Sequence, residues 1–143
     1  MRNKTVLISF GSVFLASKMP EAYKRSIIDV VRSFPNVTFI WKYERREDNI
    51  GEGVENLITS PWTPQLDLLY DARLTAFVTH GGSGSVSESR GAGVPLVAVP
   101  VAADEFRNAF QEERQRTAIV VKKEELSTPN ALRKALSKIL DCD

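Results

Sequence analysis

Short apolar runs alternate with amphipathic runs along almost the whole of this sequence. The first apolar run, 5–10, is rich in β-branched residues and ends at Gly11, whereas 20–34 places its apolar residues on one helical face. Such alternation is typical of an α/β domain with a parallel sheet. We expect strands at 5–10, 37–43, 56–60, 74–79, 94–99 and 118–121, and helices at 20–34, 83–91, about 104–116 and from 128 on, with a short one opened by Pro64.

This pattern predicts an α/β, Rossmann-like fold with one doubly wound parallel sheet. Residues 1–143 are expected to form a single domain around it. A chain of 143 residues is long enough to bury a core of its own. In such sheets, ligands bind where the carboxyl ends of the strands meet the helix starts. The residues that carry chemistry should therefore lie in the strand-to-helix loops.

Charge and composition exclude several classes of protein. The net charge is +1, so there is no electrostatic case for nucleic acid as a partner. No run approaches the ~18 apolar residues of a bilayer span, and residues 1–4 lead into a strand without a signal-peptide pattern. The single cysteine, Cys142, excludes an internal disulfide. Asn-x-Ser/Thr triplets at Asn3 and Asn36 are weak support for a lumenal origin.

The loop after the fourth strand is the most informative one. Gly81, Gly82 and Gly84 let backbone N–H groups approach a ligand closely, just where a helix begins. Those N–H groups and the positive end of the helix form an anion site, to which His80 and Ser85 add polar groups. The alternative is a tight turn that only lets the helix pack. Neither the dinucleotide fingerprint nor the P-loop motif is present.

Three further loops carry candidate residues. Ser12, in the Gly-Ser turn after the first strand, is a second phosphate contact or only part of a turn. Trp62 stands between two prolines, either as a platform for an aromatic base or as a surface anchor, with the polar Gln65 nearby.

The acidic residues Asp104 and Glu105 accept sugar hydroxyls or complement the dipole of their helix. Glu88, about one turn into the helix that follows the glycine loop, reaches ribose hydroxyls or is simply solvated.

Taken in order, these residues resemble the signature of UDP-glycosyltransferases, and most closely the C-terminal domain of animal UDP-glucuronosyltransferases. The matching positions are Trp62-x-Pro64-Gln65, 77–82, Ser85, Glu88, Gly93-Val94-Pro95, Pro100, Asp104 and Asn108.

The resemblance implies a role for each residue in binding a UDP-sugar. Trp62 would stack on uracil with the backbone of Thr63 at the base edge, and Gln65 and Glu88 would bind the ribose. His80, Ser12 and the stretch Gly82, Ser83, Gly84 and Ser85 would hold the diphosphate. Asp104 and Glu105 would meet the sugar, and Asn108 would support their loop. The family uses no metal and no cofactor, the UDP-sugar being a co-substrate.

The same resemblance places this domain as the C-terminal lobe of a two-lobed GT-B enzyme that transfers glucose or glucuronic acid to a small lipophilic acceptor. The general base and the acceptor pocket of the family belong to an N-terminal lobe that this sequence lacks. We therefore expect a soluble fragment that binds the donor and transfers no sugar. The parent protein is expected in the endoplasmic reticulum lumen or membrane, and to contact the membrane only through parts outside this domain. The alternatives are a non-catalytic module derived from a glycosyltransferase and a flavodoxin-like or receiver-type domain.

Two positions depart from the family pattern. Glu105 stands where relatives usually have glutamine, and Gly84 where they often have asparagine. A carboxylate 5–6 Å from a glucuronate carboxylate would cost about 3 kcal/mol at an effective dielectric near 20. The sequence therefore predicts a preference for a neutral sugar such as glucose, and the loss of one phosphate contact at Gly84.

Overall fold

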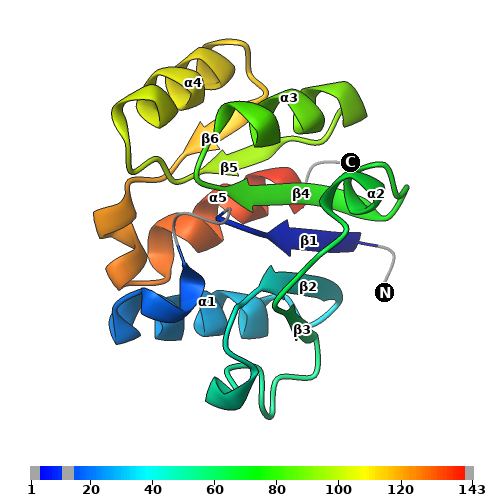
Figure 1. Ribbon diagram of the computed structural model, residues 1–143, viewed down its shortest axis with the longest axis vertical. Coiled ribbons are helices and arrows are strands. Elements are labelled where there is room, and N and C mark those ends of the chain that lie inside the picture. Colours follow the sequence, from blue (N-terminus) through cyan, green and yellow to red (C-terminus); the bar gives the residue numbers. More distant parts are fainter. Residues whose placement is uncertain (1–3, 11–14, 141–143) are drawn as a thin grey trace.

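The computed structural model describes residues 4–10 and 15–140 and has a six-stranded parallel sheet at its centre (Figure 1). The strand order is β3-β2-β1-β4-β5-β6, so the direction of winding reverses between the neighbours β1 and β4. Ile8 at the end of β1 pairs with Trp41 of β2 and Val78 of β4. The strands are β1 Lys4–Ile8, β2 Val37–Lys42, β3 Leu57–Ser60, β4 Leu74–Thr79, β5 Leu96–Ala98 and β6 Ala118–Val120.

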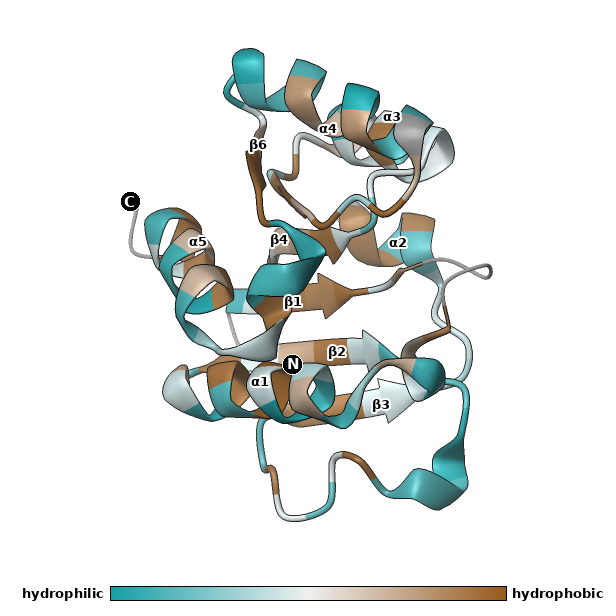
Figure 2. Ribbon diagram, turned by 90° about the vertical axis from the view of Figure 1, so that its left-hand side faces the viewer, coloured by the Kyte–Doolittle hydropathy of each residue, from teal (hydrophilic) through white to brown (hydrophobic). Residues whose placement is uncertain are grey.

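Helices cover both faces of the sheet (Figure 2). One core cluster joins β1, β2 and β4 to α1 and α5, and a second joins the opposite faces of these strands to α2 and α3. The helix α4 packs beside β6 and α3. The helices are α1 Glu21–Ser33, α2 Gln65–Leu69, α3 Ser83–Ala92, α4 Ala103–Arg114 and α5 Asn130–Leu140, and the 3₁₀ turns are η1 Ala16–Lys18, η2 Arg46–Asp48 and η3 Lys123–Ser127.

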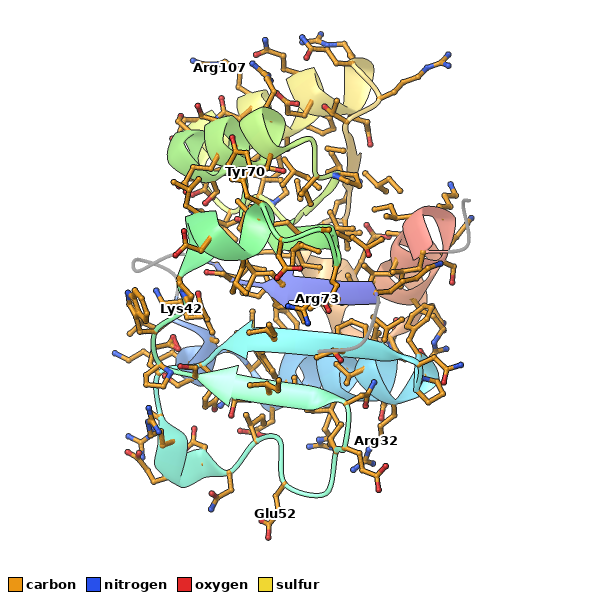
Figure 3. All side chains as sticks on the ribbon, turned by 90° about the vertical axis from the view of Figure 1, so that its right-hand side faces the viewer. Arg32, Lys42, Glu52, Tyr70, Arg73 and Arg107 are labelled. Carbon is orange, nitrogen blue, oxygen red and sulfur yellow. The ribbon has the colours of Figure 1, made fainter. Side chains whose placement is uncertain are left out.

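Apolar side chains on both faces of the strands explain why the sheet lies inside. Neighbouring residues of β1 point to opposite sides: Val6 and Ile8 enter the first core cluster and Leu7 the second. Charged side chains such as those of Arg32, Glu52 and Arg107 project outward from the periphery (Figure 3). None of the described helices is long and apolar enough to cross a lipid bilayer.

The predicted α/β fold with a doubly wound parallel sheet is confirmed, and the differences lie at element ends. The predicted strand 94–99 is reduced to β5, because the Val94 N–H donates to the Ser89 carbonyl (3.0 Å) and Pro95 has no N–H. The helix predicted to reach 116 ends at Arg114, since Arg116 has a left-handed backbone with φ of 62°.

Candidate functional site

The candidate residues lie at the rim formed by the carboxyl ends of the parallel strands. Trp62 and Thr63 follow β3, His80 follows β4, and Asp104 and Glu105 follow β5 in the first turn of α4. This rim includes the point between β1 and β4 where the winding reverses, the usual ligand position in a doubly wound sheet. Ser12 lies outside the described residues.

The β4–α3 loop exposes the start of a helix. Gly81 has a φ of 89°, which a residue with a side chain rarely adopts, and Gly82 is the N-cap of α3. No side chain among the described residues caps the helix at Gly82, so the first N–H groups of α3 are free to bind an anion. Asn108 of α4 fixes this loop by donating from Nδ2 to the Gly81 carbonyl and to Ser83 Oγ, both at 3.2 Å.

His80 is held tightly at the base of this loop. Its side chain is 15% exposed, and its Nε2 lies 3.6 Å from Glu105 Oε2. Its Nδ1 lies 3.4 Å from Thr79 Oγ1. Burial lowers the pKa of His80 below its ordinary value by more than the nearby carboxylates of Glu105 and Asp104 raise it. The imidazole is therefore neutral at pH 7 and carries one N–H donor.

Glu105 points toward the protein rather than outward. Its Oε1 accepts hydrogen bonds from the N–H groups of Val101 and Ala102, both at 3.0 Å, and its Oε2 faces His80. The glutamate thus caps α4 from its third position, as in a capping box, with an alanine at the N-cap. Asp104 is exposed at the same rim, so it is the acid that is open to a ligand.

Gln65 connects α2 to α3 on the same side of the rim. Its Nε2 donates to Ser85 Oγ at 3.3 Å and to Glu88 Oε1 at 3.4 Å. Gln65 and Glu88, both expected at the ribose, and Ser85, expected at the diphosphate, thereby form one polar cluster. Their hydroxyl, amide and carboxylate groups supply the donors and acceptors that a pair of vicinal hydroxyls requires.

Trp62 stands out from the surface with 70% of its area exposed. The preceding turn is stabilised where Ser60 Oγ donates to the Trp62 carbonyl at 2.5 Å. The adjacent Thr63 is buried, and its carbonyl accepts from the Gln65 N–H at 2.9 Å. The indole is consequently held by its backbone while its faces remain free for a flat ligand.

The family model described as "UDP-glucoronosyl and UDP-glucosyl transferase" matches residues 2–143. The chain belongs to this family. Within it, the chain is similar to a Caenorhabditis elegans protein that carries the name UDP-glucuronosyltransferase ugt-56, at 37% identity over 95% of this chain and 26% of that protein. A Bacillus subtilis protein named UDP-glucosyltransferase YojK is 34% identical over 97% of this chain and 33% of its own length.

Solved structures agree with the family fold. The glycosyltransferase of kitacinnamycin superposes with a TM-score of 0.81 at 29% identity, over 96% of this chain and 35% of that chain. The UDP-glucose: anthocyanidin 3-O-glucosyltransferase in complex with UDP has a TM-score of 0.82 at 22% identity, over 98% of this chain and 32% of that one, and shows the fold alone. The chain spans about a quarter of the length of the worm relative that it matches.

In this UDP-glycosyltransferase domain, Glu105 caps the start of its own helix, which is closer to the alternative interpretation of an acid that complements the helix dipole. The sequence interpretation directed Glu105 toward the sugar, but the carboxylate contacts loop amides and His80. A partial signal existed, since a glutamate in the third helical position is half of a capping box. Among the described residues, no group of three or more His, Cys, Asp or Glu could hold a metal ion.

Proposed function

We propose that this rim binds the UDP moiety of a UDP-sugar. Uracil stacks on Trp62, the ribose meets the Gln65–Glu88 cluster, and the diphosphate lies on the uncapped start of α3 beside His80. The observation that carries the proposal is that an exposed indole, a polar cluster and free helix N–H groups lie at one rim of the sheet. Membership of the UDP-glycosyltransferase family supports it.

In the wider activity, this domain works as the donor-binding lobe of a two-lobed enzyme. As the donor-binding lobe, it supplies a glucosyl or glucuronosyl group that the parent enzyme transfers to a small lipophilic acceptor. Its only histidine, His80, lies against Glu105 in the diphosphate site. Since no second histidine is available as a general base, this chain alone binds the donor without transferring its sugar. We propose the endoplasmic reticulum as the location of the parent protein, for which the Asn-x-Ser/Thr triplets at Asn3 and Asn36 are weak support.

Calorimetric titration with UDP, UDP-glucose and UDP-glucuronic acid at pH 8 tests the proposal. We expect all three to bind, with UDP-glucose about tenfold tighter than UDP-glucuronic acid because the exposed carboxylate of Asp104 repels the glucuronate carboxylate. The Glu105 carboxylate contacts the loop N–H groups and His80, so it contributes less to this repulsion. The Asp104→Asn variant should therefore narrow the affinity ratio, and Glu105→Gln should change it less. A clear preference for UDP-glucuronic acid would overturn the choice of sugar, and no binding of any of the three would favour a non-catalytic module.

Gly82→Ala should weaken UDP about tenfold through His80. A Cβ at Gly82 would lie 2.7 Å from His80 Nε2, so the ring would have to turn away and the diphosphate would lose one donor. Gly84→Ala, two residues further on in the first turn of α3, is the matched control because its Cβ would meet nothing within 4 Å. Equal UDP affinities for the two variants would show that the His80 ring contributes nothing to diphosphate binding.

A further inference from the structure

We propose that Glu105 is a positioning residue that acts through His80, and that a nucleotide diphosphate enters this site together with a proton taken up by the His80–Glu105 pair. The inference rests on the proposed function, because it concerns how the same rim accepts its ligand. It assigns Glu105 to the diphosphate end of the site rather than to the sugar.

The pair is fixed from both sides. Glu105 is 14% exposed in its side chain and is anchored by the two loop N–H groups, so its Oε2 cannot turn away without uncapping α4. His80 is confined by Gly82, whose ideal Cβ position is only 2.7 Å from Nε2. The separation of 3.6 Å between Nε2 and Oε2 exceeds a hydrogen bond but is within ion-pair range. The carboxylate favours the tautomer that carries its proton on Nε2.

While the imidazole of His80 is neutral, this pair is poorly suited to a diphosphate. With the imidazole uncharged and Glu105 ionised, the pair carries a net charge of −1 beside the helix start that must receive a dianion. The proton on Nε2 faces Glu105, and Nδ1 faces the Thr79 hydroxyl, so neither nitrogen offers a free donor. A second proton on the ring makes the pair neutral, and it gives Nδ1 an N–H as well, so that both ring nitrogens can donate.

The charges around the ring determine the direction of the pH effect. Among the described residues, the charged groups that act on His80 are Glu105 and Asp104, both on α4. Each raises the pKa of His80, but burial lowers that pKa by more. On the α3 side, the ring faces the backbone of Gly82. A bound diphosphate adds negative charge, which raises the pKa of His80 in the complex above that in the free protein. The affinity for the diphosphate is therefore highest at a pH below the pKa of His80 in the free protein. It falls as the pH rises through the higher pKa of His80 in the complex.

Calorimetry with UDP-glucose tests the linkage, because its diphosphate has no group that titrates near neutral pH, whereas the terminal phosphate of UDP titrates at about pH 6. Titrations at pH 7 in PIPES and in Tris, whose ionisation enthalpies differ, give the number of protons taken up. We expect between about 0.5 and 1 proton per UDP-glucose and an affinity about tenfold weaker at pH 8.5 than at pH 6.

Two variants separate positioning from simple support. His80→Gln should abolish proton uptake and make the affinity independent of pH. Glu105→Gln removes the competing charge, so the affinity at pH 8.5 should approach that at pH 6, a change that loss of a helix cap would not produce.

UDP-glucose binding with the same heat in both buffers would overturn this inference and leave the proposed function intact, whereas no binding of UDP-glucose or UDP at any pH would remove the proposed function itself. If Glu105→Gln does not fold, the buffer pair on the unaltered protein still decides.

Discussion

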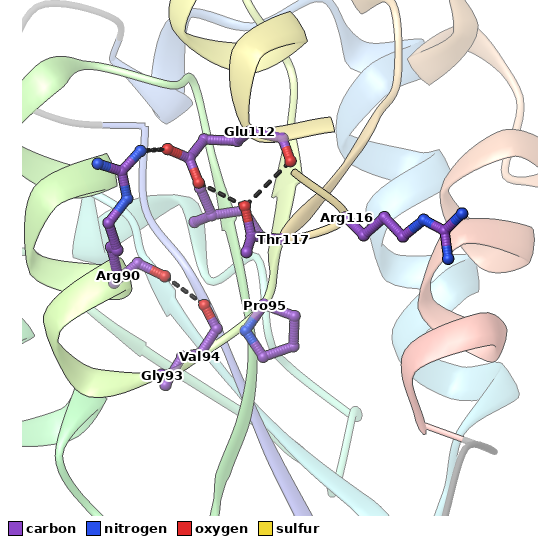
Figure 4. Close-up of a pocket in the computed structure, with 9 residues that line it drawn as sticks. Arg90, Gly93, Val94, Pro95, Glu112, Arg116 and Thr117 are labelled. Atoms are coloured by element: carbon purple, nitrogen blue, oxygen red, sulfur yellow. Dashed lines mark hydrogen bonds and ion pairs between the residues drawn. The ribbon is translucent and has the colours of Figure 1, made fainter. Parts of the chain in front are cut away.

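Arg90→Met should lower the free energy of unfolding by about 3 kcal/mol. Arg90 of α3 forms an ion pair with Glu112 of α4, beside a cavity of about 230 Å³ that lies near the start of β5 (Figure 4). The two partners differ in burial, since the Arg90 side chain is 54% exposed and that of Glu112 only 2%. Removing the arginine therefore leaves a carboxylate buried and short of its counter-charge.

The remaining partner cannot replace the arginine. The Thr117 hydroxyl lies within hydrogen-bond distance of both the Glu112 carboxylate and, at 3.0 Å, the Glu112 carbonyl, so it has a second acceptor. One hydroxyl does not compensate the desolvation of a full negative charge. Urea and thermal unfolding followed by circular dichroism measure the loss, with a midpoint about 10 °C lower for a domain of this size.

The double variant Arg90→Met with Glu112→Leu should regain most of the lost stability. It removes both charges and fills the contact between α3 and α4 with apolar atoms, and such replacements are often neutral. Arg73→Ala is the control, because the Arg73–Asp71 pair is exposed and should cost under about 1 kcal/mol. If Arg90→Met and Arg73→Ala unfold at the same temperature midpoint, then pairing of the buried Glu112 carboxylate with Arg90 is not what stabilises the contact between α3 and α4.

The elements of the fold were predictable because strands and helices impose different periods on apolar residues. The run 74–79 matches β4 from end to end, and the position of Trp62 between two prolines correctly indicated an indole outside the core. Both features are local, so neighbouring residues suffice to determine them. Loop residues assigned to different strands also reach one rim, because parallel strands all end at the same edge.

Contacts between distant residues were not predictable in the same way. A glutamate is usually exposed, yet Glu112 is buried. Its carboxylate is paired with Arg90 of α3 and with Thr117, which follows the end of α4. The amide of Asn56, expected only as part of a strand, donates to the carbonyls of Val31, Phe34 and Val37 and ties the end of α1 to the sheet. For Glu105 the sequence signal was partial: its third helical position indicated the contact with the nearby N–H groups, but nothing indicated the approach of Oε2 to His80.

Trp62→Ala should weaken UDP, UDP-glucose and UDP-glucuronic acid by the same factor, about 10- to 100-fold. Stacking of a base on an aromatic ring contributes about 1–3 kcal/mol, and uracil is common to the three ligands. The indole is 70% exposed and outside both core clusters, so the free energy of unfolding should change by less than about 0.5 kcal/mol. Titration calorimetry with each ligand, beside a thermal melt of the variant, measures both quantities.

Tyr70→Ala is the matched control for Trp62→Ala. Tyr70 is 62% exposed, but it follows the far end of α2, whereas Trp62 precedes the start of that helix at the carboxyl rim. Fluorescence adds an independent measurement, because the second tryptophan, Trp41, is fully buried and only Trp62 is accessible to iodide. Bound UDP should protect Trp62 from iodide quenching. If UDP left the iodide quenching unchanged and both variants bound UDP with the same affinity, the base would bind somewhere other than Trp62. The diphosphate attached to that base could then not reach the start of α3 in the arrangement proposed.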